Sequence, residues 1–170
     1  DDLPYPYYNE NFYRSCDWLG CISKQTYNIV KQVRGRKEDT QPWQLSYVPH
    51  GINPDKFHPV DKDTEEFKNF KNEVLQGKDY EYVVYYNSRN IRRKMTSDIM
   101  LAFQQFIRQL PEEKRDKTCL LMHTQPVDQN GTDLWAVHRD VTPDIDLVFT
   151  NKRFDHDGMN MLYNIADVTV

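Results

Sequence analysis

The residues of this chain best suited to chemistry lie in a polar loop that follows an apolar strand. Residues 82–86 read YVVYY, a β-branched and aromatic run that predicts a strand, and residues 87–94 read NSRNIRRK. A 3.6-residue apolar periodicity over residues 97–110 then predicts a helix. Backbone N–H groups at a helix start, the helix dipole and cationic side chains all favour a phosphate. The loop therefore predicts an anion site.

Arg89 and Lys94 are the strongest candidates for binding a diphosphate in this loop. Arginine offers bidentate geometry to a phosphate, and lysine offers a compact point charge. In doubly wound folds ligands bind at the carboxyl ends of parallel strands, which is where this loop begins. On the residues alone, a solvated basic turn is the simpler interpretation.

Three further segments matter for their order and spacing along the chain. They are YVPHGINPDKFHP at residues 47–59, DIDLVFT at residues 144–150 and MLYNIADV at residues 161–168. Together with the basic loop, they resemble the retaining glycosyltransferases of the GT-B fold, family 4. In that family, similar segments form the linker between two Rossmann-like domains and the first part of the second domain. The resemblance covers most of residues 15–170.

This resemblance implies both an activity and a set of binding residues. Family members transfer a sugar from a nucleotide diphosphate sugar to an acceptor, with retention and without a metal or other cofactor. The residues that correspond to Arg89 and Lys94 bind the donor diphosphate, and no catalytic residue falls within the chain. The resemblance also implies donor or acceptor contacts for His50, Gly51, Asn151 and Lys152.

Several positions depart from the family pattern or allow another interpretation. Ser88 occupies the position of the family's glycine before Arg89. Met95 occupies the position of the family's glycine after Lys94, and its side chain affects how closely phosphates can approach the start of the helix. His50 stands for asparagine and is also consistent with a hydrogen-bonded loop histidine. Gly51 is expected to allow a positive φ, so that the chain turns sharply. The polar loop from residue 123 is consistent either with sugar or base contacts or with a plain surface loop.

The composition limits the remaining function classes. A net charge of -4 provides no global basic field, so nucleic acid is not an expected partner. No apolar run approaches the roughly 20 residues of a membrane span. Cys16, Cys21 and Cys119 lack CxxC spacing, which fits reduced thiols in the cytoplasm and no metal site. The expected partners are a nucleotide diphosphate sugar and an unidentified acceptor.

Strand-like and helix-like segments alternate along the chain, which predicts an α/β fold. We expect a Rossmann-like parallel sheet with flanking helices, as part of a two-domain GT-B architecture. Residues 1–50 would end the N-terminal domain, residues 51–79 would form the linker and a helix, and residues 80–170 would begin the nucleotide-sugar-binding domain. Trp18, Trp43 and Trp135 are expected to be buried or half-buried.

Both ends of the sequence look cut, so we expect a fragment of a longer enzyme. The family's paired-glutamate motif follows the last strand seen here, and this fragment alone should be inactive. A non-catalytic nucleotide-binding or interaction module with a Rossmann-like fold is the alternative. The sequence does not identify the donor base, the sugar, the acceptor or the oligomeric state.

Overall fold

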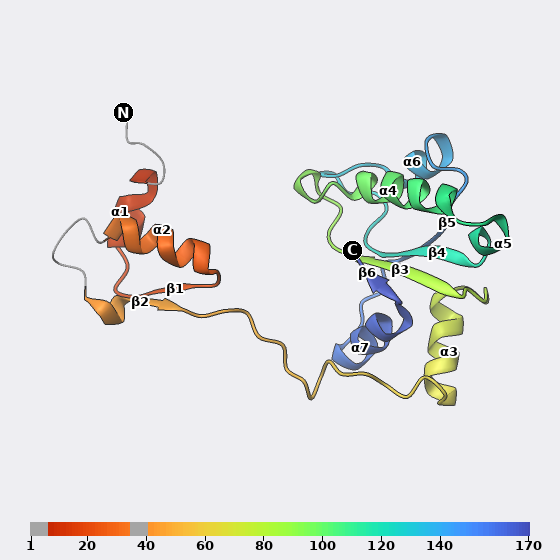
Figure 1. Ribbon diagram of the computed structural model, residues 1–170, viewed down its shortest axis with the longest axis horizontal. Coiled ribbons are helices and arrows are strands. Elements are labelled where there is room, and N and C mark those ends of the chain that lie inside the picture. Colours follow the sequence, from red (N-terminus) through yellow and green to blue (C-terminus); the bar gives the residue numbers. More distant parts are fainter. Residues whose placement is uncertain (1–6, 35–40) are drawn as a thin grey trace. The chain divides into compact units, whose positions relative to one another are not determined.

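The computed structural model describes residues 7–34 and 41–170, and the chain forms two compact units, Asp1–Asn53 and Pro54–Val170 (Figure 1).

The first unit contains a parallel β-α-β arrangement. Strands β1 (Leu19–Cys21) and β2 (Leu45–Tyr47) pair in parallel, and helix α2 (Lys24–Arg34) connects them through a segment that includes the short helix η2 (Pro42–Gln44). The Ser23 hydroxyl accepts the N–H of Thr26 at 3.0 Å, which caps the start of α2. The short helices η1 (Tyr7–Asn9) and α1 (Glu10–Arg14) precede this arrangement.

The second unit is built on a parallel four-stranded sheet with the order β5-β4-β3-β6. The strands are β3 (Tyr82–Asn87), β4 (Thr118–His123), β5 (Asp146–Thr150) and β6 (Val168–Thr169). Their register pairs Val83 with Cys119 and Leu120 with Leu147. The predicted parallel sheet is therefore confirmed. Because β4 and β6 lie on opposite sides of β3, the winding direction reverses at β3, and such a reversal opens a crevice at the carboxyl ends of the strands.

Helices cover both faces of this sheet (Figure 1). On one face, α4 (Thr96–Gln109) and α6 (Leu134–Asp140) pack on the alternate strand residues that include Val84 and Leu120, and the short helix α5 (Glu112–Arg115) follows α4. On the other face, α3 (Glu65–Val74) and α7 (His156–Ile165) pack on the residues that include Tyr85 and Leu121. Strand side chains that are buried on both faces are typical of a parallel α/β sheet.

Polar caps set the limits of these helices. Thr64, Asp133 and Asp155 each accept a backbone N–H in the first turn of α3, α6 and α7. At the end of α3 the cap is Leu75, and Gln76 is the first residue beyond it. Gln76 (φ 56°) and Gly77 (φ 77°) both have left-handed backbone, and they donate to Glu73 and Asn72 in a Schellman arrangement.

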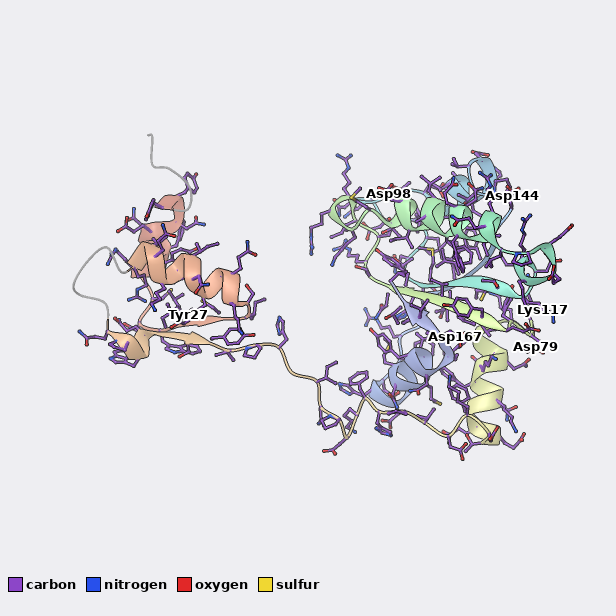
Figure 2. The ribbon with its side chains drawn as sticks, in the orientation of Figure 1. Tyr27, Asp79, Asp98, Lys117, Asp144 and Asp167 are labelled. Carbon is purple, nitrogen blue, oxygen red and sulfur yellow. The ribbon has the colours of Figure 1, made fainter. Side chains whose placement is uncertain are left out.

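Asp167 fixes the last strand to the sheet (Figure 2). Its carboxylate accepts the N–H of Val83 at 2.7 Å, and its own N–H donates to the Val83 carbonyl at 3.0 Å. This reciprocal pair holds β6 beside β3 although β6 is only two residues long.

Two expectations about single residues are wrong. Trp18, Trp43 and Trp135 are 51%, 63% and 53% exposed. Trp18 lies between helices and strands, Trp43 lies in the three-residue helix η2, and in α6 the core residue is Leu134, the neighbour of Trp135. Gly51 does not have a positive φ. Nothing lies within 4 Å of a Cβ built at Gly51, so neither a left-handed backbone nor close packing requires glycine there.

Candidate functional site

The carboxyl ends of β3, β4 and β5 open onto a polar cavity of about 380 Å³. Its walls carry amide, hydroxyl and imidazole groups, with Arg89 as the cation and Asp128 as the anion. The lining residues are Asn87, Ser88, Arg89, His123, Thr124, Gln125, Asp128 and Asn151. The carboxyl edge of a parallel sheet is the expected position of a ligand site in such a fold.

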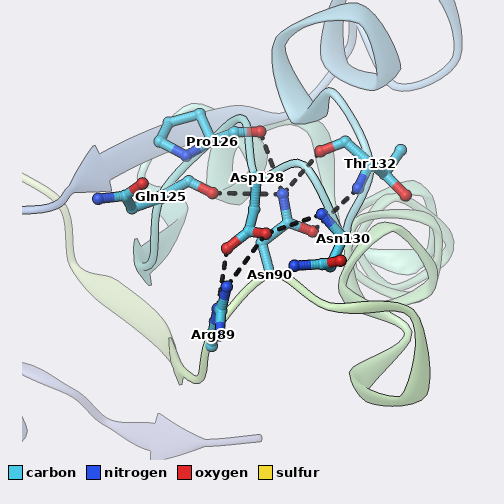
Figure 3. A network of polar contacts seen from close by, with 7 residues as sticks. All are labelled: Arg89, Asn90, Gln125, Pro126, Asp128, Asn130 and Thr132. Atoms are coloured by element: carbon cyan, nitrogen blue, oxygen red, sulfur yellow. Dashed lines mark hydrogen bonds and ion pairs between the residues drawn. The ribbon is translucent and has the colours of Figure 1, made fainter.

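A single buried side chain joins the two loops that form most of this cavity (Figure 3). Asn90, which is 1% exposed, lies in the loop after β3, and its amide nitrogen donates to the carbonyls of Gln125, Pro126 and Thr132 in the loop after β4. Its Oδ1 accepts the N–H of Thr132 at 3.2 Å. These carbonyls lie outside helices and strands, so the Asn90 side chain supplies hydrogen bonds that regular secondary structure would otherwise provide.

Gly131 allows the two loops to approach each other. A Cβ at Gly131 would lie 2.6 Å from Asn90 Oδ1 and closer still to the Asn90 carbonyl oxygen. The backbone N–H of Arg92 also donates to the Asn130 carbonyl at 3.2 Å. The position therefore requires glycine for close packing and not for its φ angle.

Arg89 and Asp128 form an ion pair across the same two loops (Figure 3). Arg89 Nε donates to Asp128 Oδ2 at 2.9 Å, and Nη2 donates to Oδ1 at 3.4 Å. The guanidinium, with help from the Asn130 N–H, lowers the pKa of the Asp128 carboxyl, and Asp128 raises the pKa of Arg89. Both groups are therefore charged at neutral pH.

His123 belongs to a line of polar contacts along the carboxyl edge. The Asn87 amide nitrogen donates to the Tyr163 hydroxyl at 2.9 Å, and Asn87 Oδ1 lies 3.2 Å from His123 Nδ1. His123 Nε2 lies 3.1 Å from the carbonyl of Lys152. These contacts link α7, β3, β4 and the segment after β5, so they fix the floor of the cavity.

Lys94 ends the short helix η3 (Arg92–Lys94) just before α4. Its side chain is exposed, and it is not among the described residues that line the cavity. Met95 has φ 49°, the left-handed conformation that glycine favours, and no side chain caps the start of α4. The N–H groups at the very start of α4 and the nearby cations are components of an anion site, whereas the N–H of Asp98 donates to the Met95 carbonyl and Asp98 is an acidic residue of the same turn.

The structure places the other predicted contact residues differently. Asn151 lines the cavity. Lys152 instead extends to α3, where its Nζ pairs with Glu73 at 2.9 Å. His50 and Gly51 are exposed and belong to the first unit. The ligand roles of all these residues, and of Arg89 and Lys94, stay predictions.

Sequence reasoning missed Asp128 and Asn90. Asp128 opens an Asp-x-Asn-Gly run, which is a common turn pattern, so its local signal was that of a surface turn. Asn90 stands between two cations in the basic loop. The partners of both residues are more than thirty positions away, and no local pattern reports such pairings.

Among the residues that the structure describes, no group of three or more His, Cys, Asp or Glu side chains could hold a metal ion. No helix in the same part of the chain is both long and apolar enough to cross a membrane.

Solved structures with a similar fold include sugar-phosphate enzymes. An alpha,alpha-trehalose 6-phosphate synthase from Burkholderia multivorans aligns with 94% of this chain at 12% identity, with a TM-score of 0.66, and 39% of that chain is covered. The N-terminal domain of a Candida albicans trehalose-6-phosphate phosphatase aligns with 94% at 13% identity, with a TM-score of 0.61 and 42% of that chain covered. The sequence matches no protein-family profile and no curated protein.

The synthases among these structures have the GT-B fold and belong to glycosyltransferase family 20. The expected GT-B fold is therefore confirmed. The chain spans about two fifths of the length of the structures that it matches. At these identities the likeness shows the fold, and the assignment to family 4 stays a prediction.

Proposed function

We propose that the chain is part of a retaining glycosyltransferase that transfers a sugar from a nucleotide diphosphate sugar to an acceptor. The observation that carries this proposal is the polar cavity at the carboxyl ends of β3, β4 and β5, with Arg89 in its wall and the uncapped start of α4 in the same connecting loop. A departing nucleoside diphosphate needs its charge neutralised, and without a metal this falls to cations and helix dipoles. The sugar-transferring neighbours of the same fold support this interpretation.

In this proposal the two loop cations have different roles. Arg89 binds the diphosphate from the cavity wall, and Lys94 adds a point charge near the free N–H groups of α4. Asn151 contacts the nucleoside from the segment after β5. Residues 1–50 end the N-terminal domain and residues 80–170 begin the donor-binding domain. The three free cysteines support a cytoplasmic location.

Calorimetric titration of the complete protein with UDP and GDP tests the proposed site. Arg89→Ala and Lys94→Ala should each weaken binding of the preferred diphosphate by roughly ten- to a hundredfold, since a lost charge-assisted contact is worth about 1.5–3 kcal/mol. Arg108→Ala and Lys68→Ala are matched controls, because both cations lie in exposed ion pairs away from the cavity. Equal affinities for all five proteins would overturn the assignment.

A glycosyl-transfer assay separates this function from a non-catalytic nucleotide-binding module. An enzyme should consume the sugar nucleotide that matches its preferred diphosphate and release that diphosphate, with the anomeric configuration kept in the product. Tight diphosphate binding without turnover of any sugar nucleotide would favour the module.

A further inference from the structure

Asp128 is anchored in the wall of the polar cavity more firmly than Arg89, its ion-pair partner. The Asp128 side chain is 10% exposed, whereas that of Arg89 is 63% exposed. Asp128 Oδ1 accepts the N–H of Asn130 at 2.9 Å, and the Asp128 carbonyl accepts the N–H of Gly131 at 2.9 Å. The turn itself therefore holds the carboxylate, and Arg89 is the more exposed member of the pair.

The geometry of the pair leaves part of the guanidinium unused. Asp128 contacts the Nε and Nη2 edge of Arg89, at 2.9 Å and 3.4 Å. A guanidinium has five N–H donors in a rigid plane, so the Nη1 donors and one Nη2 donor remain available. A phosphate can therefore bind Arg89 without displacing Asp128.

We propose that Asp128 is a positioning residue, which orients the Arg89 guanidinium so that its remaining donors are ready for a diphosphate. The inference rests on the proposed donor site. An exposed arginine samples many rotamers, and ordering it when the ligand arrives opposes binding. Asp128 orders Arg89 beforehand, in the same wall of the cavity where the diphosphate would bind.

A competing role for the same carboxylate gives the opposite result. If Asp128 mainly occupied Arg89 and repelled the incoming phosphates, its removal would strengthen diphosphate binding. The unused donors of Arg89 and the separate anchoring of Asp128 by Asn130 favour positioning.

A double-mutant cycle on the complete protein distinguishes the two roles. We expect Asp128→Ala to weaken UDP or GDP binding by about three- to tenfold, the range for immobilising one flexible side chain on binding. In an Arg89→Ala background the same change should have no effect, because there is no guanidinium left to orient. A role limited to the shape of the loop would weaken binding equally in both backgrounds, and that result would overturn the proposal.

Asp144→Ala is the matched control. It removes a second Arg–Asp pair, that of Arg108 with Asp144 at 3.1 Å, and Figure 2 shows Asp144 near the opposite end of α4 from Asp98. This variant should bind the diphosphate as the wild type does. Unchanged or tighter binding by Asp128→Ala overturns the positioning role alone. If the wild type binds neither UDP nor GDP, the donor site fails and the role of Asp128 fails with it.

Discussion

Gly131 packs against Asn90 so closely that no side chain fits between them. A Cβ at Gly131 would lie 2.6 Å from Asn90 Oδ1, and the nearest atoms are part of the backbone and of a 1% exposed side chain. The loop after β3 and the loop after β4 therefore behave as one structural element. The cavity wall that holds Arg89 and Asp128 depends on this contact.

We expect Gly131→Ala to lower the free energy of unfolding by about 1–3 kcal/mol, the usual effect of overpacking a tight contact. The matched control is Gly51→Ala, where nothing lies within 4 Å of the new Cβ, and its effect should stay within about 0.5 kcal/mol. Urea unfolding followed by circular dichroism measures both. Equal stabilities of the two variants would show that the loops can separate without cost.

Asn90→Ala should destabilise the protein to a similar degree, because the carbonyls of Gln125, Pro126 and Thr132 lose the donor that they share and the N–H of Thr132 loses its acceptor. Leaving a donor or acceptor unsatisfied costs about 1–3 kcal/mol, although the Pro126 carbonyl keeps the N–H of Leu134. Gln129→Ala is the control, since Gln129 is an exposed residue of the same loop. If Asn90→Ala unfolds at the same urea concentration as Gln129→Ala, water replaces the Asn90 side chain effectively.

The sequence predicted the second unit well where local patterns suffice. Strands β3 and β4 carry apolar residues on both faces of the sheet, and in α4 the apolar residues Met100, Phe103 and Ile107 recur at helical spacing. These hydrophobic patterns were enough to predict which segments are strands and which are helices. The short helix α5 was missed because its four residues, EEKR, carry no apolar period. The tryptophans were misplaced because side-chain size alone does not determine burial.

The candidate site was predictable only in part. The position of Arg89 at a strand end followed from the order of strand, basic loop and helix. Its pairing with Asp128 and the linkage through Asn90 did not, because both depend on how two loops meet in three dimensions. For Lys152, too, the sequence did not predict the partner of the side chain. Its position in the sequence suggested a ligand contact, whereas its side chain pairs with Glu73.

Asp167 should be important for the stability of the sheet edge. Asp167→Ala removes the carboxylate that accepts the Val83 N–H at 2.7 Å, and hydrogen bonds to charged groups contribute about 1.5–3 kcal/mol. Asp167→Asn keeps an acceptor and should lose less. Hydrogen exchange of the Val83 amide reports the contact directly. Unchanged protection of Val83 in Asp167→Ala would show that the strand pairing alone holds β6.

Cys119 should make the protein less stable at alkaline pH. Burial raises the pKa of its thiol from 9.0 to about 12, so the unfolded chain ionises first as the pH rises. The stability that the neutral, buried thiol contributes is fully present below the thiol pKa of the unfolded chain, about 9. It is lost progressively as the pH rises above that value. Urea unfolding between pH 7 and about pH 10.5 should show this loss, and Cys119→Ala should reduce the slope. An identical slope in both proteins would assign the loss to buried tyrosines such as Tyr85, whose pKa burial also raises.

Met95→Gly should stabilise the protein and also improve access to the start of α4. A non-glycine residue in left-handed backbone is strained by roughly 1 kcal/mol, and at φ 49° glycine relieves that strain. Gln76→Gly is the matched control, because Gln76 has φ 56° at the end of α3. Both variants should raise the free energy of unfolding by about 0.5–1 kcal/mol.

Only Met95→Gly should also strengthen diphosphate binding, since removing its exposed side chain lets phosphates approach the uncapped first turn. If the two glycine variants bind UDP and GDP alike, the start of α4 is not part of the donor site.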